Sequence, residues 1–260
     1  YGLQGMFGDG SGNATLDGNA TVSFGASANN DLSFYGSTSS TTLTLAPTVL
    51  VHGQNGQLRA TTGIVDQGTI SADVAGGTIT VVASPLVNQG VVEARNGGTL
   101  SLQGTWGEGG TFRAAGGTVE AGGTTTIGAG SRLNLDLAAN YTVTNSFLGA
   151  GGVAFNPTVG VTATLAAAQS YSGTTSVISG TLALSGGNDR INPVGSLSVA
   201  TGANVNLNGF NQTIATLSGA GTIVNGAVST TSVFTISSGG SFTGSFNDGA
   251  GILALQKSGP

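Results

Sequence analysis

The chain has 260 residues, of which 47 are glycine, 5 are proline and none is cysteine; charged residues make up only 7%, with a formal net charge of -5. Low charge together with 38% hydrophobic residues argues against disorder, which requires weak hydrophobicity and high net charge. Without cysteine there is neither a disulfide framework nor a thiolate metal site. Six Lys and Arg argue against the basic stripe that nucleic acid or an anionic membrane surface requires, and no run of 18 apolar residues predicts a membrane-spanning helix.

Residues 1–60 alternate between apolar and polar side chains without a specific motif. Stretches such as Thr42-Leu43-Thr44-Leu45 predict short strands with one apolar and one polar face. We therefore assign residues 1–60 to weakly patterned N-terminal solenoid coils. Because the chain starts at Tyr1 without a methionine or a signal peptide, we expect a mature or excised piece of a longer protein.

Residues 61–170 contain an internal repeat with a period of roughly 20 to 22 residues, which is in the range of solenoids. One repeated segment occurs three times, at Asp66–Ala72, Asn88–Ala94 and Glu108–Ala114. A second segment recurs with the same period, at Gly76–Thr80, Gly97–Ser101 and Gly116–Glu120. Aligning the copies stacks apolar residues into two columns, Ile70–Val92–Phe112 and Ile79–Leu100–Val119. An antiparallel sandwich has no reason to keep this register, whereas parallel coils place like residues above like.

The same alignment places Glu93 and Arg113 at equivalent outward positions on adjacent coils. We expect these two side chains to face each other as an exposed pair worth about 0 to 1 kcal/mol. Such a pair supports the register of the coils and does not indicate a function.

Residues 171–260 carry a different phrase, in which Tyr171-Ser172-Gly173-Thr174-Thr175 is followed by Gly180-Thr181-Leu182. Gly251–Pro260 looks like the truncated opening of a further copy. This pattern closely resembles the passenger-associated transport repeat of bacterial autotransporters. The resemblance covers the last third of the chain strongly, and the middle third as generic β-helical passenger sequence.

The resemblance implies a right-handed parallel β-helix that is secreted to the bacterial cell surface through an outer-membrane β-barrel. Family members serve most often in adhesion, aggregation or biofilm formation. Together with the repeat, it leads us to expect an all-β fold: a single elongated right-handed β-solenoid of about 20–22 residues per coil.

Two candidate metal or catalytic features lie in the first quarter of the chain. His52, the only histidine, precedes the turn signal Gly53–Gly56, so we expect a solvated loop imidazole and no histidine-dependent triad or multi-histidine zinc site. Gly8–Asn13 with Asp17 is faintly similar to a calcium-binding turn. Calcium prefers about six to eight oxygen ligands, and only two carboxylates are close, so a polar turn is expected.

Three acidic residues, Glu93, Glu120 and Asp136, are candidates for the carboxylate pair of a glycoside hydrolase. A lyase would need clustered acids and a catalytic base, but the six basic residues look scattered: Arg59, Arg95, Arg113, Arg132, Arg190 and Lys257. We therefore expect no enzyme activity and assign no catalytic, cofactor-binding or metal residues.

Aromatic residues are few, and Phe112 and Phe234 fall on apolar phases, so we expect them in the core. Trp106 is the best candidate for a surface contact, although core or corner packing is favoured. The Asn-x-Thr sequences at Asn13 and Asn19 are expected to be bare turns.

The sequence thus predicts a structural, extracellular segment of a larger adhesin or filament, which acts through length and repetition and needs no cofactor. Expected partners are further copies or a continuation of the same chain, with surface glycans and neighbouring cells left open and nucleic acid disfavoured. A β-helical polysaccharide-processing enzyme and a carbohydrate-binding module are the alternatives. The sequence names neither the ligand nor the source organism.

Overall fold

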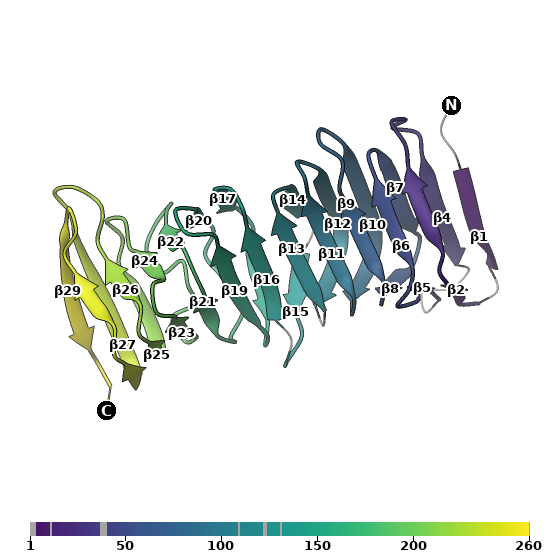
Figure 1. Cartoon of the computed structure of the whole chain (residues 1–260). Helices are drawn as coiled ribbons and strands as arrows, with labels where there is room; N and C mark the ends of the chain where they lie inside the picture. Colours follow the sequence, from purple (N-terminus) through teal and green to yellow (C-terminus); the bar gives the residue numbers. More distant parts are fainter. Residues whose placement is uncertain are drawn as a thin grey trace. The chain divides into compact units, whose positions relative to one another are not determined.

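A computed structural model describes residues 4–10, 12–36, 41–108, 110–121, 124–130 and 132–259. The chain forms two compact units, Tyr1–Leu133 and Asn134–Pro260, which are described separately. Both consist of short parallel strands stacked coil upon coil (Figure 1). No helix long and apolar enough to cross a membrane occurs among the described residues.

The first unit contains two stacks of strands that run along successive coils. One sheet contains the strand order β1-β4-β7-β10-β12-β15. In the same sheet β2 pairs with β5, β5 with β8 and β8 with β10, and β14 pairs with β12. The other sheet has the order β3-β6-β9-β11-β13. The strands are β1 (Gln4–Gly10), β2 (Ala14–Leu16), β3 (Thr21–Phe24), β4 (Asp31–Gly36), β5 (Thr42–Leu45), β6 (Leu50–Gly53), β7 (Gly56–Ala60), β8 (Gly63–Asp66), β9 (Thr69–Ala72), β10 (Thr78–Asn88), β11 (Val91–Arg95), β12 (Thr99–Glu108), β13 (Thr111–Ala115), β14 (Thr118–Ala121) and β15 (Thr124–Ile127).

The apolar columns predicted from the repeat are confirmed in the first unit. Val92 pairs in register with Ile70 on one side and Phe112 on the other, and all three are buried. Leu100 pairs in the same way with Ile79 and Val119. The two columns place the core between the two sheets, because alternate residues of each strand point inward.

The second unit repeats this arrangement with two further sheets, ordered β16-β19-β21-β23-β25-β27-β29 and β17-β20-β22-β24-β26-β28. The strands of the unit are β16 (Arg132–Leu137), β17 (Tyr141–Val143), β18 (Phe147–Gly149), β19 (Gly152–Pro157), β20 (Thr162–Leu165), β21 (Thr175–Val177), β22 (Thr181–Leu184), β23 (Ser196–Val199), β24 (Asn204–Asn206), β25 (Gln212–Gly219), β26 (Thr222–Val224), β27 (Thr231–Phe242), β28 (Ser245–Asn247) and β29 (Ile252–Lys257). Of these, β18 belongs to neither of the two sheets.

The core of the second unit is also built from columns. Val205 pairs in register with Leu182 and Ile223, and each of the three side chains is 0% exposed. Gln212, likewise 0% exposed, accepts a hydrogen bond from Ile191 N at 3.0 Å and donates one to Ile191 O at 2.8 Å. A buried amide at this corner therefore satisfies backbone groups of the preceding coil that would otherwise be desolvated without partners.

A glycine permits the tight approach between coils at the end of β25. Gly219 has φ = 102°, and a Cβ placed there would lie 2.0 Å from Val199 O. Both the left-handed backbone and the lack of space require glycine at this position.

The fold class predicted from the sequence is confirmed. The described residues form an all-β parallel solenoid of about ten turns with roughly 22 residues in each turn. The three-part organisation into residues 1–60, 61–170 and 171–260 stays a prediction.

Candidate functional site

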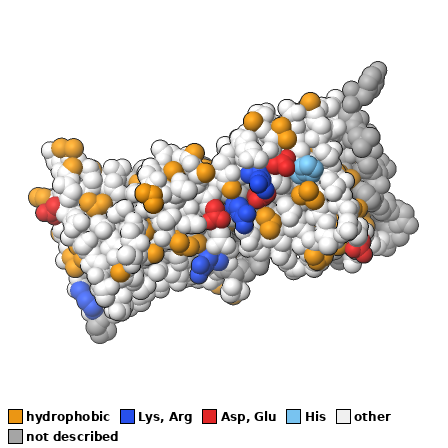
Figure 2. Space-filling model, in the orientation of Figure 1, with side chains coloured by type: hydrophobic (Ala, Val, Ile, Leu, Met, Phe, Trp, Pro, Cys, Tyr) orange, Lys and Arg blue, Asp and Glu red, His pale blue; other side chains and the backbone are white. Residues whose placement is uncertain are grey.

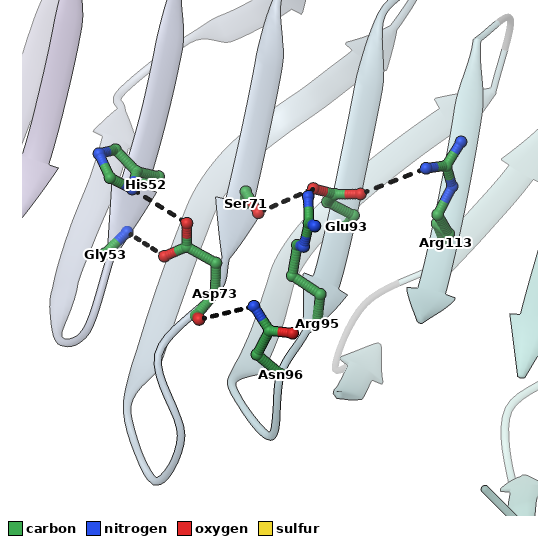
Figure 3. Close-up of polar contacts among 8 residues, drawn as sticks. All are labelled: His52, Gly53, Ser71, Asp73, Glu93, Arg95, Asn96 and Arg113. Carbon is green, nitrogen blue, oxygen red and sulfur yellow. Dashed lines mark hydrogen bonds and ion pairs between the residues drawn. The ribbon is translucent and has the colours of Figure 1, made fainter. Parts of the chain in front are cut away.

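Charged side chains gather on the outward face of the sheet formed by β3, β6, β9, β11 and β13 (Figures 2 and 3). Backbone register places one residue from each of four successive coils in a single column, His52–Ser71–Glu93–Arg113. Two further residues extend from this column at the strand ends. We call the set the charged band; its members are His52, Ser71, Asp73, Glu93, Arg95 and Arg113.

Glu93 is the centre of the charged band. Its Oε1 accepts a hydrogen bond from Ser71 Oγ at 2.9 Å and pairs with Arg95 Nη1 at 3.2 Å, while its Oε2 lies 3.6 Å from Arg113 Nη1. The Glu93 side chain is only 6% exposed. The pairing of Glu93 with Arg113 is thus confirmed, but the expectation of an exposed pair is wrong, because neighbouring side chains cover the carboxylate.

His52 forms the second pair of the charged band. Its Nδ1 lies 3.0 Å from Asp73 Oδ2, and Asp73 Oδ1 accepts a hydrogen bond from Gly53 N at 3.1 Å. The His52 side chain is 28% exposed. The expectation of a solvated loop imidazole is wrong. His52 lies within β6, which ends at Gly53, the first residue of the turn signal.

The turns that follow the strands hold the ends of the charged band. Asp73 follows β9 directly, and its backbone carbonyl accepts a long hydrogen bond of 3.5 Å from Asn96 Nδ2, one coil further on. Asn96 itself has φ = 51°, a left-handed conformation that asparagine tolerates better than most residues. The turn after β9 is therefore tied to the turn after β11.

Sequence reasoning missed Ser71 and Asp73 and treated Arg95 as scattered from Arg113. The structure corrects this: Arg95 and Arg113 share one carboxylate. A usable signal was present, since Asp73 follows His52 by 21 residues and Glu93 follows Ser71 by 22, both close to one period.

The charged band shows little sign of acid–base or nucleophilic chemistry. Both Glu93 oxygens contact hydrogen-bond donors, and the Ser71 hydroxyl donates to Glu93 and not to His52. A nucleophile would need its base within hydrogen-bond reach. The band presents both signs of charge to solvent, since the Arg95 and Arg113 side chains are 51% and 39% exposed and that of Asp73 is 26% exposed.

The other acidic candidates are Asp136 in the second unit, and Glu120 and the carboxylates of the candidate calcium turn in the first. Asp136 in the second unit accepts a hydrogen bond from Asn156 Nδ2 at 2.9 Å, one coil away. The side chain of Glu120 lies outside the described residues, as does that of Asp9 in the candidate calcium turn. Asp17 is exposed and accepts a hydrogen bond from Gly18 N at 2.6 Å. Among the described residues, no three His, Cys, Asp or Glu side chains come close enough to hold a metal ion.

The other basic candidates make local contacts. Arg59 contacts Gln57, Arg190 donates to Ala166 O at 3.0 Å, and Lys257 donates to Gly259 O at 2.6 Å, while Arg132 is exposed.

The aromatic candidates are mostly internal. Phe112 and Phe234 are 2% and 0% exposed, which confirms that both belong to the core. The side chain of Trp106 lies outside the described residues. Asn13 Oδ1 accepts a hydrogen bond from Thr42 N at 2.9 Å and so ties two coils together.

One shallow hollow lies near the last coils of the second unit. It has a volume of about 220 Å³, and the residues that line it are Leu217, Ile236, Gly239, Gly240, Phe242, Phe246 and Lys257. Ring contacts of Phe246 with Phe234 and Phe242, at 6.1 and 5.2 Å between centroids, continue the core to this hollow.

Two buried titratable side chains have strongly raised pKa values. Burial raises the pKa of Asp66 from 3.8 to about 7, partly offset by a hydrogen bond from Gly68 N. Burial also raises the pKa of Tyr171, whose hydroxyl contacts Thr175 Oγ1. Both groups lie inside the solenoid, so their shifts reflect packing and not a surface site.

None of the family models, curated proteins or solved structures with which the chain was compared matches it.

Proposed function

We propose that the chain is a structural β-solenoid segment of a larger extracellular adhesin or filament, which mediates adhesion, aggregation or fibre formation through its length and repetition. The resemblance of residues 171–260 to autotransporter passenger repeats supports a location at the bacterial cell surface, with secretion through an outer-membrane β-barrel. The parallel solenoid is compatible with a passenger of that kind.

The observation that carries the proposal is the use of polar side chains to join one coil to the next. Hydrogen bonds connect Gln67 to Gln89, Ser84 to Thr105 and Thr216 to Ser196, with separations of 22, 21 and 20 residues. Asp136 and Asn156 are joined in the same way at a separation of 20 residues. In an enzyme we would expect such groups to converge on a substrate, whereas here they reinforce the stack.

The last coil of the second unit offers an edge for self-association. Leu255 pairs in register with the fully buried Phe234, yet Leu255 itself is 53% exposed. An unpaired strand edge with an inward-facing apolar residue is a template for a further coil. We expect a coil of a second copy, or of a continuing chain, to cover it.

A bead assay tests the adhesive role. Beads coated with the purified chain should form clusters that grow with coating density, whereas beads coated with a compact globular protein of similar mass and charge should stay dispersed. Electron micrographs of the same material should show rods or fibres. Compact particles together with dispersed beads would contradict the proposal.

Two charge-matched variants locate the self-association surface. Leu255→Asp introduces a charge into the exposed apolar edge and should reduce clustering. Val228→Asp adds the same charge at a side chain that is 76% exposed and lies outside a strand, so it should leave clustering unchanged. An equal loss in both variants would show that net charge, and not the edge, controls clustering.

A further inference from the structure

Three Asp-Gly pairs occur in the chain, at Asp9-Gly10, Asp17-Gly18 and Asp248-Gly249. In such a pair the amide nitrogen of the glycine can attack the side-chain carboxyl before it, because glycine has no Cβ to block the approach. We propose that the fold selects Asp17-Gly18 for this reaction and makes Asp17 a site of spontaneous isoaspartate formation. The inference is independent of the proposed adhesive function.

The first step is the distance between the reacting groups. Gly18 N lies 2.6 Å from Oδ1 of Asp17, the residue directly before it. Since Cγ is bonded to this oxygen, nitrogen and Cγ are held close to the separation of a near-attack arrangement, which is roughly 3–3.5 Å. Both residues are exposed, so water reaches the reacting groups.

The second step is the restraint of this turn by the next coil. Asp17 and Gly18 lie between β2 and β3, and Gly18 has φ = 72°, a left-handed conformation that suits glycine. Ala46 N donates a hydrogen bond to Leu16 O at 2.9 Å, and Thr48 Oγ1 donates one to Gly18 O. The backbone is thus held on both sides of the Asp17 side chain, which keeps the carboxyl beside Gly18 N.

The third step is the bond exchange itself. Gly18 N attacks Cγ of the protonated Asp17 carboxyl, an N–Cγ bond forms, and one carboxyl oxygen leaves as water together with the amide hydrogen. Water then opens the resulting succinimide. Cleavage of the N–Cγ bond restores aspartate, whereas cleavage between the nitrogen and the Asp17 backbone carbonyl carbon leaves the chain linked through the side chain, as isoaspartate.

The pair in the second unit, Asp248-Gly249, is held differently. Asp248 Oδ1 accepts a hydrogen bond from Leu253 N at 2.9 Å, which directs the carboxylate to an amide five residues further on. A Cβ at Gly249 would lie 2.6 Å from Asn225 O, so this glycine packs tightly against the preceding coil. Asp248 is therefore the matched control inside the same chain. The side chain of Asp9 lies outside the described residues.

Isoaspartate has a structural consequence at this turn. It lengthens the main chain by one carbon between Leu16 and Gly18, whose carbonyl groups both bond to the next coil. The longer turn cannot keep both bonds in their present geometry. We therefore expect conversion to loosen the corner between β2 and β3 and to make it easier for a protease to cut there.

Peptide mapping of the purified whole chain tests the inference. After several weeks at neutral pH, electron-transfer fragmentation assigns isoaspartate to single residues and so separates Asp17 from Asp9. We expect isoaspartate to form about tenfold faster at Asp17 than at Asp248, because a reacting pair held close and aligned gains rate. In guanidinium chloride the two residues should convert at similar rates, since only the fold distinguishes them. Deamidation of asparagine changes the mass and isoaspartate formation from aspartate does not, so the two reactions are told apart.

Two variants complete the test. Asp17→Glu keeps the charge but requires a larger ring, so conversion at position 17 should be lost while that at Asp248 is unchanged. Asp17→Asn, in which ammonia leaves instead of water, should convert faster than the natural chain. Equal rates at Asp17 and Asp248 in the folded protein, the same ratio in guanidinium chloride, or no conversion of Asp17→Asn would overturn the inference. Bead clustering of freshly purified protein tests the proposed function separately.

Discussion

Asp66 gives the sharpest test of how this solenoid handles polar groups in its interior. The side chain is 0% exposed, its Oδ1 accepts a hydrogen bond from Gly68 N at 3.1 Å, and its Oδ2 is buried without a hydrogen-bond partner. Its register neighbours are Leu45 and Asn88, neither of which is charged. We predict that Asp66→Asn stabilises the protein at neutral and alkaline pH.

Asn88 shows why an amide suits this column. Its Oδ1 accepts a hydrogen bond from Gly90 N at 3.0 Å, as Asp66 does from Gly68, and its Nδ2 donates to Thr111 O at 2.9 Å. Val91 is the register partner of Thr111 on the preceding coil. The Val91 carbonyl therefore stands to residue 66 as the Thr111 carbonyl stands to Asn88. An amide at position 66 could donate to it, whereas an ionised carboxylate could not.

The expected magnitude follows from the raised pKa. Burial moves the pKa of Asp66 from 3.8 to about 7, a difference of about 3 pH units, which at ~1.4 kcal/mol per unit is on the order of 4 kcal/mol. Because the folded-state pKa is the higher one, the folded protein binds the proton more tightly than the unfolded chain. Stability from this group is therefore fully present below pH 3.8 and is lost as the pH rises through 7.

Urea unfolding followed by circular dichroism from pH 4 to pH 8 measures the effect. The difference in unfolding free energy between Asp66→Asn and the natural chain should be near zero at pH 4 and increase to several kcal/mol at pH 8. Asn88→Asp is the reciprocal control, because it places a carboxyl in the same column and should lose stability as the pH rises. A pH-independent difference for Asp66→Asn, or a destabilised variant at pH 8, would refute the reasoning.

Three further predictions concern single contacts, each measured as a shift of the urea midpoint. Glu93→Ala removes the acceptor that the charged band shares and should lower the free energy of unfolding by about 1–3 kcal/mol, with a smaller effect in high salt. An unchanged midpoint would show that water replaces Glu93 as the hydrogen-bond partner of the two guanidinium groups at no cost in stability. Gln212→Leu should cost a similar amount, because Ile191 N and O lose their buried partner; an unchanged midpoint would mean that water enters the corner. Gly219→Ala should destabilise the protein strongly, since the new Cβ would lie 2.0 Å from Val199 O. Gly202→Ala is the control: φ is 81°, but a Cβ there meets nothing within 4 Å, so only the backbone cost of about 1 kcal/mol is expected. Equal losses in the two glycine variants would argue against a steric clash.

The apolar columns could be predicted because periodicity alone determines them. Once coils of about 22 residues stack in parallel, Ile70, Val92 and Phe112 must share a column and alternate residues must point inward. The same reasoning placed Arg113 beside Glu93. A sequence period therefore gives pairs of neighbours on adjacent coils without any knowledge of side-chain packing.

The burial of Glu93 could not be predicted in the same way. Alternation assigns Glu93 to the outward face, and outward residues are ordinarily solvated. Its 6% exposure arises from long side chains that lie over it, namely those of Arg95 in the same strand and Arg113 in the next coil. Coverage of this kind depends on rotamers, which a repeat pattern does not specify.

His52 was misplaced for a related reason. The residues after it signal a turn, but a turn signal marks the end of a strand only to within a few residues. Its partner Asp73 lies one coil further on, and the contact depends on a turn after β9 that brings the carboxylate back over β6. A search for complementary residues one period apart would have found this pair.

Stacking also explains how the charged band can be present without disturbing the fold. Inward columns are constrained by both neighbouring coils, so a change at Val92 affects Ile70 and Phe112 together. Outward columns have no such shared core, and polar residues in them, such as Ser196 and Thr216, bond to the adjacent coil. A few charged residues placed in one outward column therefore create a distinct surface while every coil keeps its register.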